Sequence, residues 1–221
     1  MNLIEYPDSE MMMIDLANRI AGELNTCLLD HEWASLAVPG GTTPGPLFDD
    51  LCAADLDWSR VHVLLTDERR VPADHPRSNE RLVRERLLTG RAAAAKFVRL
   101  VPEGDGDWDG LQETARAELP ISILLLGMGA DMHTASLFPC APELPDALAS
   151  NAPPLVSVTP PGDDLEPRLS LSAPALKSAM TTHIVITGDA KREALEKARH
   201  LKPVDAPVAA VLGQAAIHWA P

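Results

Sequence analysis

The sequence predicts an α/β fold with one mainly parallel sheet, and three observations support this. Short apolar runs rich in Val, Ile and Leu alternate with longer segments of helical periodicity. The apolar runs are nearly continuous in hydrophobicity, which is typical of strands covered on both faces. The chain has 221 residues, of which 46% are hydrophobic and 23% charged, so it is long enough for one full-sized core. We therefore expect a single domain over residues 1–221.

Strands and helices are expected to alternate along the chain. The predicted strands are 34–38, 61–66, 121–126, 155–158, 168–172, 183–187 and 207–212. The predicted helices are 8–29, 43–54, 77–89, 108–118 and 189–199. Such alternation indicates right-handed crossovers between parallel strands. The strand at 168–172 alternates apolar and polar residues, so it is expected at an edge or in an antiparallel pair. The Pro- and Asp-rich segment 139–167 is expected to be a long irregular connection.

Charge and composition exclude several classes of partner. The formal net charge of -13 repels nucleic acids and anionic membrane surfaces. The three cysteines are far apart and form no CxxC pair, so we expect buried free thiols and neither a zinc site nor a disulfide framework. The amino terminus does not resemble a secretory leader, and the longest apolar stretch, around Ile121–Ala130, is too short to span a membrane. A cytoplasmic protein is the expectation.

The first predicted strand is followed by a glycine-rich turn. Residues 39–45 read Pro-Gly-Gly-Thr-Thr-Pro-Gly, and two adjacent glycines allow a sharp turn and close approach of a ligand. Thr43 is a candidate N-cap of the next helix. The amides of Gly41, Thr42 and Thr43 could bind an anion, or the segment could be an ordinary strand-to-helix turn. It is not a P-loop, because the Gly-Lys-Ser/Thr ending is missing.

The second predicted strand ends in a run of charge. Residues 66–72 read Thr-Asp-Glu-Arg-Arg-Val-Pro. Asp67 could bind sugar hydroxyls or transfer a proton, and Arg69 could hold a phosphate or carboxylate. A solvated charge run is the alternative interpretation. A short distance downstream, Ser78 is a candidate helix N-cap.

The third predicted strand leads into the segment richest in reactive groups. Residues 126–139 read Leu-Gly-Met-Gly-Ala-Asp-Met-His-Thr-Ala-Ser-Leu-Phe-Pro. His133 is a natural general base near neutral pH, and Asp131 could orient its ring. Asp131 could equally cap a following helix. A dinucleotide-binding motif is disfavoured because the third glycine is replaced by Met132, and neither GxSxG nor HExxH occurs.

Taken together, these segments resemble the 6-phosphogluconolactonase family, whose relatives include glucosamine-6-phosphate deaminase. The similarity covers the turn at 39–44, the charged run at 66–72 with Ser-Asn at 78–79, and the histidine segment at 126–139. It continues with Pro-Arg-Leu-Ser-Leu-Ser at 167–172, Thr-Gly-Asp-Ala-Lys at 187–191 and Pro-Val-Ala-Ala-Val-Leu at 207–212. These matches follow the family's order over nearly the whole chain. The resemblance implies a Rossmann-like three-layer α/β/α sandwich of the deaminase-lactonase type.

The resemblance also implies an activity and roles for individual residues. The activity is hydrolysis of 6-phospho-D-glucono-1,5-lactone, a step of the pentose phosphate pathway, without a cofactor or metal. His133 would activate water. Arg168 and Lys191 would hold the substrate phosphate with the turn amides, and Asp67 and Arg69 would line the sugar. The protein is expected to be a monomer or weak homodimer.

One residue departs from the family motif, which has glycine where this chain has Met132. If that position requires a positive φ, methionine is strained there. Because the flanking residues are intact, we expect the loop to tolerate it.

The same motifs leave two alternative functions open. A glucosamine-6-phosphate deaminase would carry Asn-Glu where this chain has Leu137 and Phe138, so the missing carboxylate favours the hydrolase. A non-enzymatic sugar-phosphate sensor would be expected to carry a DNA-binding extension, for which there is no room before residue 34.

Overall fold

The computed structural model describes residues 2–101, 107–162 and 165–221. Across these residues the main sheet has seven strands in the order β1-β10-β9-β6-β2-β3-β5, and all neighbouring strands are parallel. Their bounds are β1 Asn2–Glu5, β2 Ala34–Val38, β3 Val61–Leu65, β5 Lys96–Val98, β6 Ile123–Gly127, β9 Thr181–Thr187 and β10 Ala215–Ala220. Because the strands are parallel, the loops that follow β2, β3, β6 and β9 leave the sheet at the same edge.

A second, smaller sheet extends from the carboxyl end of β3. It consists of β4 (Asp67–Arg69), β8 (Arg168–Leu171) and β7 (Leu155–Val158), in that order and antiparallel. Thr66 joins the two sheets, because its amide donates to the Val38 carbonyl at 2.9 Å and its carbonyl accepts from the Leu171 amide at 2.8 Å. The antiparallel pairing expected for 168–172 is therefore confirmed.

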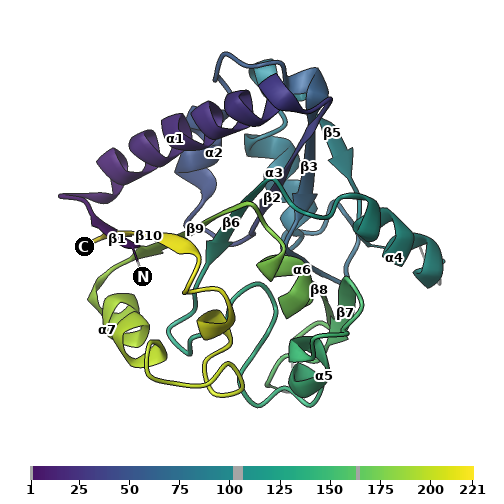
Figure 1. Cartoon of the computed structure of the whole chain (residues 1–221), viewed down its shortest axis with the longest axis vertical. Coiled ribbons are helices and arrows are strands. Elements are labelled where there is room, and N and C mark those ends of the chain that lie inside the picture. The colour runs from purple at the N-terminus through teal and green to yellow at the C-terminus, as the bar shows by residue number, and fades with distance from the viewer. Residues whose placement is uncertain (1, 102–106, 163–164) are drawn as a thin grey trace.

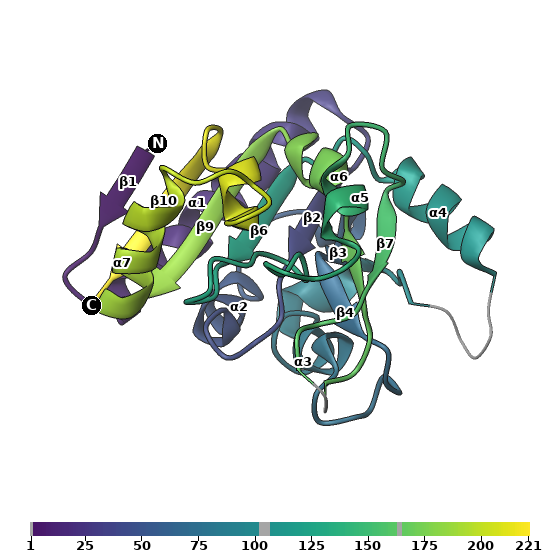
Figure 2. The same cartoon turned by 90° about the horizontal axis from the view of Figure 1, so that it is seen from below.

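Helices cover both faces of the main sheet, as Figures 1 and 2 show. On one face, α1 (Ser9–Asp30), α2 (Gly45–Leu51) and α3 (Asn79–Arg86) pack on β2, β3 and β6. On the other face lie α4 (Trp108–Ala117), α5 (Leu144–Leu148), α6 (Ala173–Lys177) and α7 (Asp189–Ala198). The three-layer α/β/α sandwich is thus confirmed.

The long helix α1 follows from its sequence pattern. Asp8 is its N-cap, and the Asp8 carboxylate accepts from the Met11 amide at 2.8 Å. Buried residues recur at every fourth position, at Met12, Leu16, Ile20, Leu24 and Leu28. That spacing gives the helix one apolar face against the sheet. Among the described helices, none combines the length and hydropathy needed to cross a membrane.

One predicted strand was wrong. The apolar run at 207–212 is not a strand but begins with the 3-10 helix η3 (Pro207–Ala210), and the last strand is β10. Short buried apolar runs of either type look alike in sequence. The segment 139–167 contains β7, where the strand at 155–158 was predicted, and also the helix α5, which was not predicted; residues 163–164 lie outside the described part. All three cysteines are free, but none is fully buried as expected: Cys27 and Cys52 are partly buried and Cys140 is exposed.

Candidate functional site

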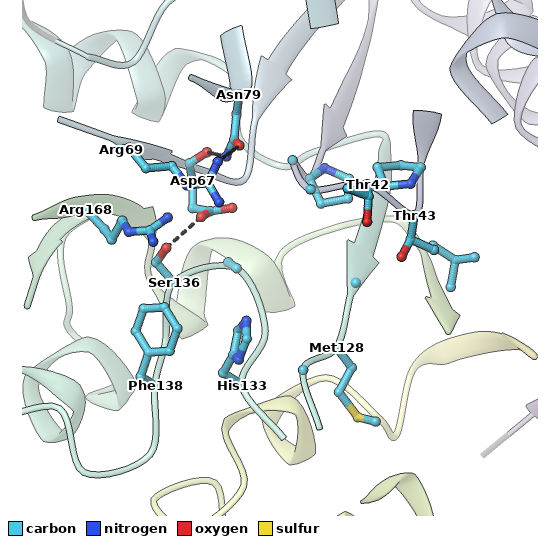
Figure 3. Close-up of a pocket in the computed structure, with 18 of the residues that line it drawn as sticks. Thr42, Thr43, Asp67, Arg69, Asn79, Met128, His133, Ser136, Phe138 and Arg168 are labelled. Atoms are coloured by element: carbon cyan, nitrogen blue, oxygen red, sulfur yellow. Dashed lines mark hydrogen bonds between the residues drawn. The ribbon is translucent and has the colours of Figure 1, made fainter. Parts of the chain in front are cut away.

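A cavity of about 340 Å³ opens at the edge of the sheet where β2, β3, β6 and β9 end. Eight of the nine residues predicted for the site line it, namely Gly41, Thr42, Thr43, Asp67, Arg69, His133, Arg168 and Lys191. Asp131 does not line the cavity but contacts the ring of His133, which does. Figure 3 shows His133 on the loop after β6, with Arg168 and Asp67 to one side and Thr42 and Thr43 to the other.

His133 and Asp131 form a hydrogen-bonded pair. The His133 Nδ1 atom lies 2.5 Å from Asp131 Oδ1, and the same oxygen accepts from the His133 amide at 3.3 Å. This hydrogen bond lowers the pKa of Asp131 below its usual 3.8. An ionised carboxylate on Nδ1 makes that nitrogen the donor and leaves Nε2 as the acceptor. Gly129 makes room for the pair, because a Cβ there would lie 2.2 Å from His133 Nδ1.

The loop that carries His133 is held by its own backbone. The Gly129 amide donates to the His133 carbonyl at 3.0 Å, and the Met132 amide donates to the Gly129 carbonyl at 3.0 Å. The Met132 carbonyl accepts from the Val208 amide at 3.1 Å, which ties the loop to η3. Met132 has a φ of 68°, so the position where the family motif has glycine does adopt the left-handed conformation. No helix begins between β6 and α5, so Asp131 does not act as a helix cap in this fully described stretch.

Phe138 packs against the ring of His133. The two ring centroids are 4.7 Å apart and the planes are inclined by 44°. Phe138 is 9% exposed and lines the cavity. Its ring therefore restricts the space in which the imidazole can rotate. The sequence motif contained this residue, but nothing in the pattern indicated that its side chain would meet His133.

Asp67 lies between two hydroxyl groups at the wall of the cavity. Ser136 Oγ donates to Asp67 Oδ2 at 2.6 Å, and Thr66 Oγ1 donates to Asp67 Oδ1 at 3.2 Å. Ser136 belongs to the same loop as His133, so this hydrogen bond joins that loop to the charged run after β3 (Figure 3). Ser136 is a site residue that sequence reasoning did not single out.

Asn79 positions Arg69 and was likewise not predicted as a site residue. Its Oδ1 accepts from Arg69 Nη1 at 2.8 Å, and its Nδ2 donates to the Asp67 carbonyl at 2.8 Å. Asn79 is 2% exposed and packs directly over Gly40, where a Cβ would lie 1.8 Å from Asn79 Oδ1. One side chain thus fixes the glycine turn, Asp67 and Arg69 relative to one another.

The buried carboxylate of Glu68 attaches the start of α3 to β4, next to the site. It accepts from the backbone amides of Arg69 at 2.7 Å, Asn79 at 2.8 Å and Glu80 at 2.7 Å, and from Ser78 Oγ at 3.0 Å. An anion satisfies the otherwise unpaired amides at the start of a helix. Ser78 caps the same helix through the Arg81 amide, as predicted. Glu68 therefore has a structural role rather than the role of a solvated loop charge.

Arg69 and Arg168 form a cationic wall. They are paired directly across β4 and β8, so their side chains lie on the same face of the small sheet. Arg168 is only 6% exposed, and burial, followed by the charge of Arg69, lowers its pKa. The Nε atoms of both guanidinium groups are buried and have no hydrogen-bond partner within the described residues. One buried and one partly buried cation, each with an unpaired Nε–H group at the same cavity wall, are suited to bind an anion.

The opposite wall combines Lys191 with the glycine turn. Lys191 lies in the first turn of α7 and is half-buried, and this burial lowers its pKa. Gly41 has a φ of 87°, a conformation that glycine adopts without strain. Thr43 is not the N-cap that we expected, because α2 begins at Gly45 after Pro44 and has no side-chain cap. Thr42 and Thr43 face the cavity instead.

Among the residues that the structure describes, no three His, Cys, Asp or Glu side chains converge in a way that could hold a metal ion.

Comparisons with known proteins give a consistent result. The family model described as glucosamine-6-phosphate isomerases/6-phosphogluconolactonase matches residues 7–219. A 6-phosphogluconolactonase of Mesorhizobium japonicum is 37% identical over 98% of this chain and 94% of its own length. One of Caulobacter vibrioides is 39% identical over 90% of this chain and 86% of its own. The crystal structure of a 6-phosphogluconolactonase from Shewanella baltica is 34% identical, covers 100% of this chain and 97% of its own, and superposes with a TM-score of 0.92.

Proposed function

The chain belongs to the glucosamine-6-phosphate isomerase/6-phosphogluconolactonase family, and we propose that, like its lactonase relatives, it hydrolyses 6-phospho-D-glucono-1,5-lactone to 6-phosphogluconate. The observation that carries this proposal is the position of one base relative to one anion site. His133, with Nδ1 held by Asp131, lines the same cavity as Arg69 and Arg168, whose Nε atoms have no hydrogen-bond partner among the described residues. A hydrolase that acts on a phosphorylated lactone needs both features in one place.

In the proposed mechanism His133 activates water. The lactone carbonyl is electrophilic enough that a positioned water can attack it without a nucleophilic side chain. The Nε2 atom of His133 takes a proton as the water oxygen forms a bond to C1. The ring C1–O bond then breaks, and the imidazolium returns its proton to the departing ring oxygen. Asp131 holds the ring in the tautomer that this step requires and stabilises the positive charge.

The remaining site residues bind and orient the substrate. Arg168, Lys191 and the amides of Gly41, Thr42 and Thr43 hold the phosphate, and Asp67 and Arg69 line the sugar. This binding is remote from C1, so it contributes to catalysis by fixing the carbonyl beside the water. The charge that develops on the carbonyl oxygen is stabilised by Arg69 or by nearby amides. These local cations also explain how a chain with a net charge of -13 attracts an anion.

The deaminase alternative has a weaker basis in this site. That chemistry moves protons between two carbons and uses an additional carboxylate after the histidine. Here the corresponding position is Phe138, whose ring packs against His133. An apolar ring at that place supplies no proton acceptor.

The test is hydrolysis of freshly generated 6-phosphoglucono-1,5-lactone, measured as acid release above the spontaneous rate. The unphosphorylated lactone and glucosamine 6-phosphate serve as matched substrates. Acceleration with the phosphorylated lactone alone is the expected result. Ammonia release from glucosamine 6-phosphate would identify a deaminase, and tight binding of the phosphosugar without turnover would identify a sensor.

A further inference from the structure

A chain of five hydrogen-bonded side chains lies on the α1 side of the sheet, and none of its members lines the cavity. At its centre are two histidines on neighbouring parallel strands, His183 of β9 and His218 of β10, which are 1% and 0% exposed. Tyr6 follows β1, and Asp15 and Glu23 extend from α1. This series of hydrogen-bonded side chains therefore connects the long helix α1 to the three strands at one edge of the sheet.

The contacts run in one unbroken series from carboxylate to carboxylate. Asp15 Oδ2 lies 2.6 Å from the Tyr6 hydroxyl, which lies 3.0 Å from His218 Nδ1. His218 Nε2 lies 3.0 Å from His183 Nδ1, and His183 Nε2 lies 2.7 Å from Glu23 Oε2. Both nitrogens of both rings are therefore used.

Each of these four contacts needs one proton between its two atoms. In their ordinary states at neutral pH, Tyr6 supplies one proton and each neutral imidazole supplies one, while Asp15 and Glu23 supply none. Three protons cannot complete four hydrogen bonds. One of the four contacts would then bring two acceptors together away from bulk water, which is unfavourable.

We propose that the folded protein binds one additional proton in this series of side chains and holds it at neutral pH on His183 Nε2, in the hydrogen bond to Glu23. The Asp15 end does not need it, because the half-exposed Asp15 carboxylate accepts from the Tyr6 hydroxyl. Tyr6 then accepts from His218 Nδ1, and His218 Nε2 accepts from His183 Nδ1. Only the His183–Glu23 contact remains without a proton.

The surroundings of the other members agree with this placement. Burial, followed by the charge of His183, lowers the pKa of His218 to about 3, so that His218 stays a neutral acceptor. Burial and the Asp15 carboxylate raise the pKa of Tyr6 to about 12, so that the phenol keeps its proton. The other titratable groups nearby are Arg19, 3.6 Å from Asp15, and Cys27, whose pKa is raised by burial and by Glu23. Neither changes its charge near neutral pH.

A bound proton makes stability depend on pH with a defined sign. In the unfolded chain His183 and Glu23 hold no such proton above about pH 7, so folding takes one up. The folding equilibrium constant then falls about tenfold for each unit of rising pH until the folded chain also releases the proton. Release removes the hydrogen bond that attaches α1 to β9, so the helix is held less firmly in alkaline solution.

Glu23→Gln is the informative variant. The glutamine amide supplies its own N–H to His183 Nε2, so all four hydrogen bonds form without the additional proton. Urea unfolding of the full chain between about pH 7 and pH 8.5 is compared with that of the wild type. For each unit of rising pH, we expect the folding equilibrium constant of the wild type to fall about tenfold more than that of the variant. The matched control is Glu193→Gln, an exposed change of the same kind on α7, which should keep the wild-type slope.

Nitrogen NMR of the histidine rings in the wild-type protein provides a test that requires no variant. One buried histidine should show two protonated ring nitrogens at about pH 8, where free histidine is neutral, and this signal should be lost in Glu23→Gln. Equal pH slopes for wild type and Glu23→Gln, or two neutral buried histidines in the spectrum, would overturn the proposal.

Discussion

Arg69 and Arg168 face each other directly across the antiparallel strands β4 and β8, and both side chains reach one cavity wall. Like charges at directly opposed positions of a sheet destabilise it, and here both Nε atoms are also buried without a partner in the described part of the chain. The fold therefore maintains an unfavourable arrangement that a bound anion would relieve. This is the physical reason to place a phosphorylated substrate there.

Replacing Arg168 with methionine should increase the stability of the free protein and weaken its binding of phosphate. Methionine retains an apolar stem but removes the repulsion, so the free energy of unfolding without ligand should rise by up to about 1 kcal/mol. Phosphate at a hundredfold excess over its Kd should stabilise the wild type by about 2.7 kcal/mol and the variant far less. Thermal unfolding with and without inorganic phosphate measures both effects. Arg116→Met, an exposed change on α4, should leave the phosphate effect intact.

Asn79→Ala should weaken the hold on Arg69. A hydrogen bond to a charged group is worth about 1.5–3 kcal/mol, so we expect kcat/KM for the phosphorylated lactone to fall roughly 10- to 150-fold. Asn79→Asp keeps an acceptor for Arg69 Nη1 and should recover part of the loss. Steady-state kinetics of the two variants provides the test. Equal losses of kcat/KM in both would show that Arg69 does not depend on this contact.

Met132→Gly should relieve strain in the histidine loop. A non-glycine residue in the left-handed region costs about 1–2 kcal/mol, and Met132 has a φ of 68°. Because the methionine side chain also packs against the core, the proper reference is Met132→Ala, which keeps the strain but loses the packing. The glycine variant should be more stable than the alanine variant by about 1 kcal/mol in urea unfolding. A more stable alanine variant would mean that the backbone is not strained there.

Asp131→Asn should impair catalysis more than binding. The amide can no longer hold His133 through an ionised acceptor, so kcat should fall within the roughly 10²–10⁴-fold range that a general base contributes. KM should change little, since Asp131 does not line the cavity. A large rise in KM with an unchanged kcat would argue against an orienting role.

The same variant gives a prediction for acid stability. The pKa of Asp131 is lowered in the folded protein, so the Asp131–His133 hydrogen bond stabilises the fold at pH values above the ordinary carboxyl pKa of 3.8. This contribution is lost as the pH falls through the lower, folded value. Unfolding of wild type and Asp131→Asn should therefore differ at neutral pH and converge in strong acid.

Much of the fold was predictable because the central strands carry an unambiguous pattern. The run Ala34–Val38 is buried at every position, and such runs followed by glycine turns indicate parallel strands. The strand β4 was not predictable, because Asp67–Arg69 is a run of charge that becomes a strand only by pairing with β8. The last strand was predicted at 207–212 and not at β10. The reason is that β10 includes His218, a polar residue that is buried against His183, which is distant in sequence.

The site was partly predictable for a similar reason. Loops after parallel strands must meet at one edge, which brought His133, Asp67 and the glycine turn together in the prediction. Asn79, Ser136 and Phe138 were not assigned, because their roles arise from contacts across separate loops. A sequence pattern shows that such residues are present but not which neighbour each one meets.

The most direct test of the central claim is acid release from 6-phosphoglucono-1,5-lactone by wild type and His133→Ala, each corrected for the spontaneous rate. Thermal unfolding of both proteins confirms that the variant is folded. We expect strong acceleration by the wild type and a kcat that is lower by roughly 10²–10⁴-fold in the variant, with binding of inorganic phosphate unchanged. A folded His133→Ala protein with full activity would contradict the assignment of His133 as the base.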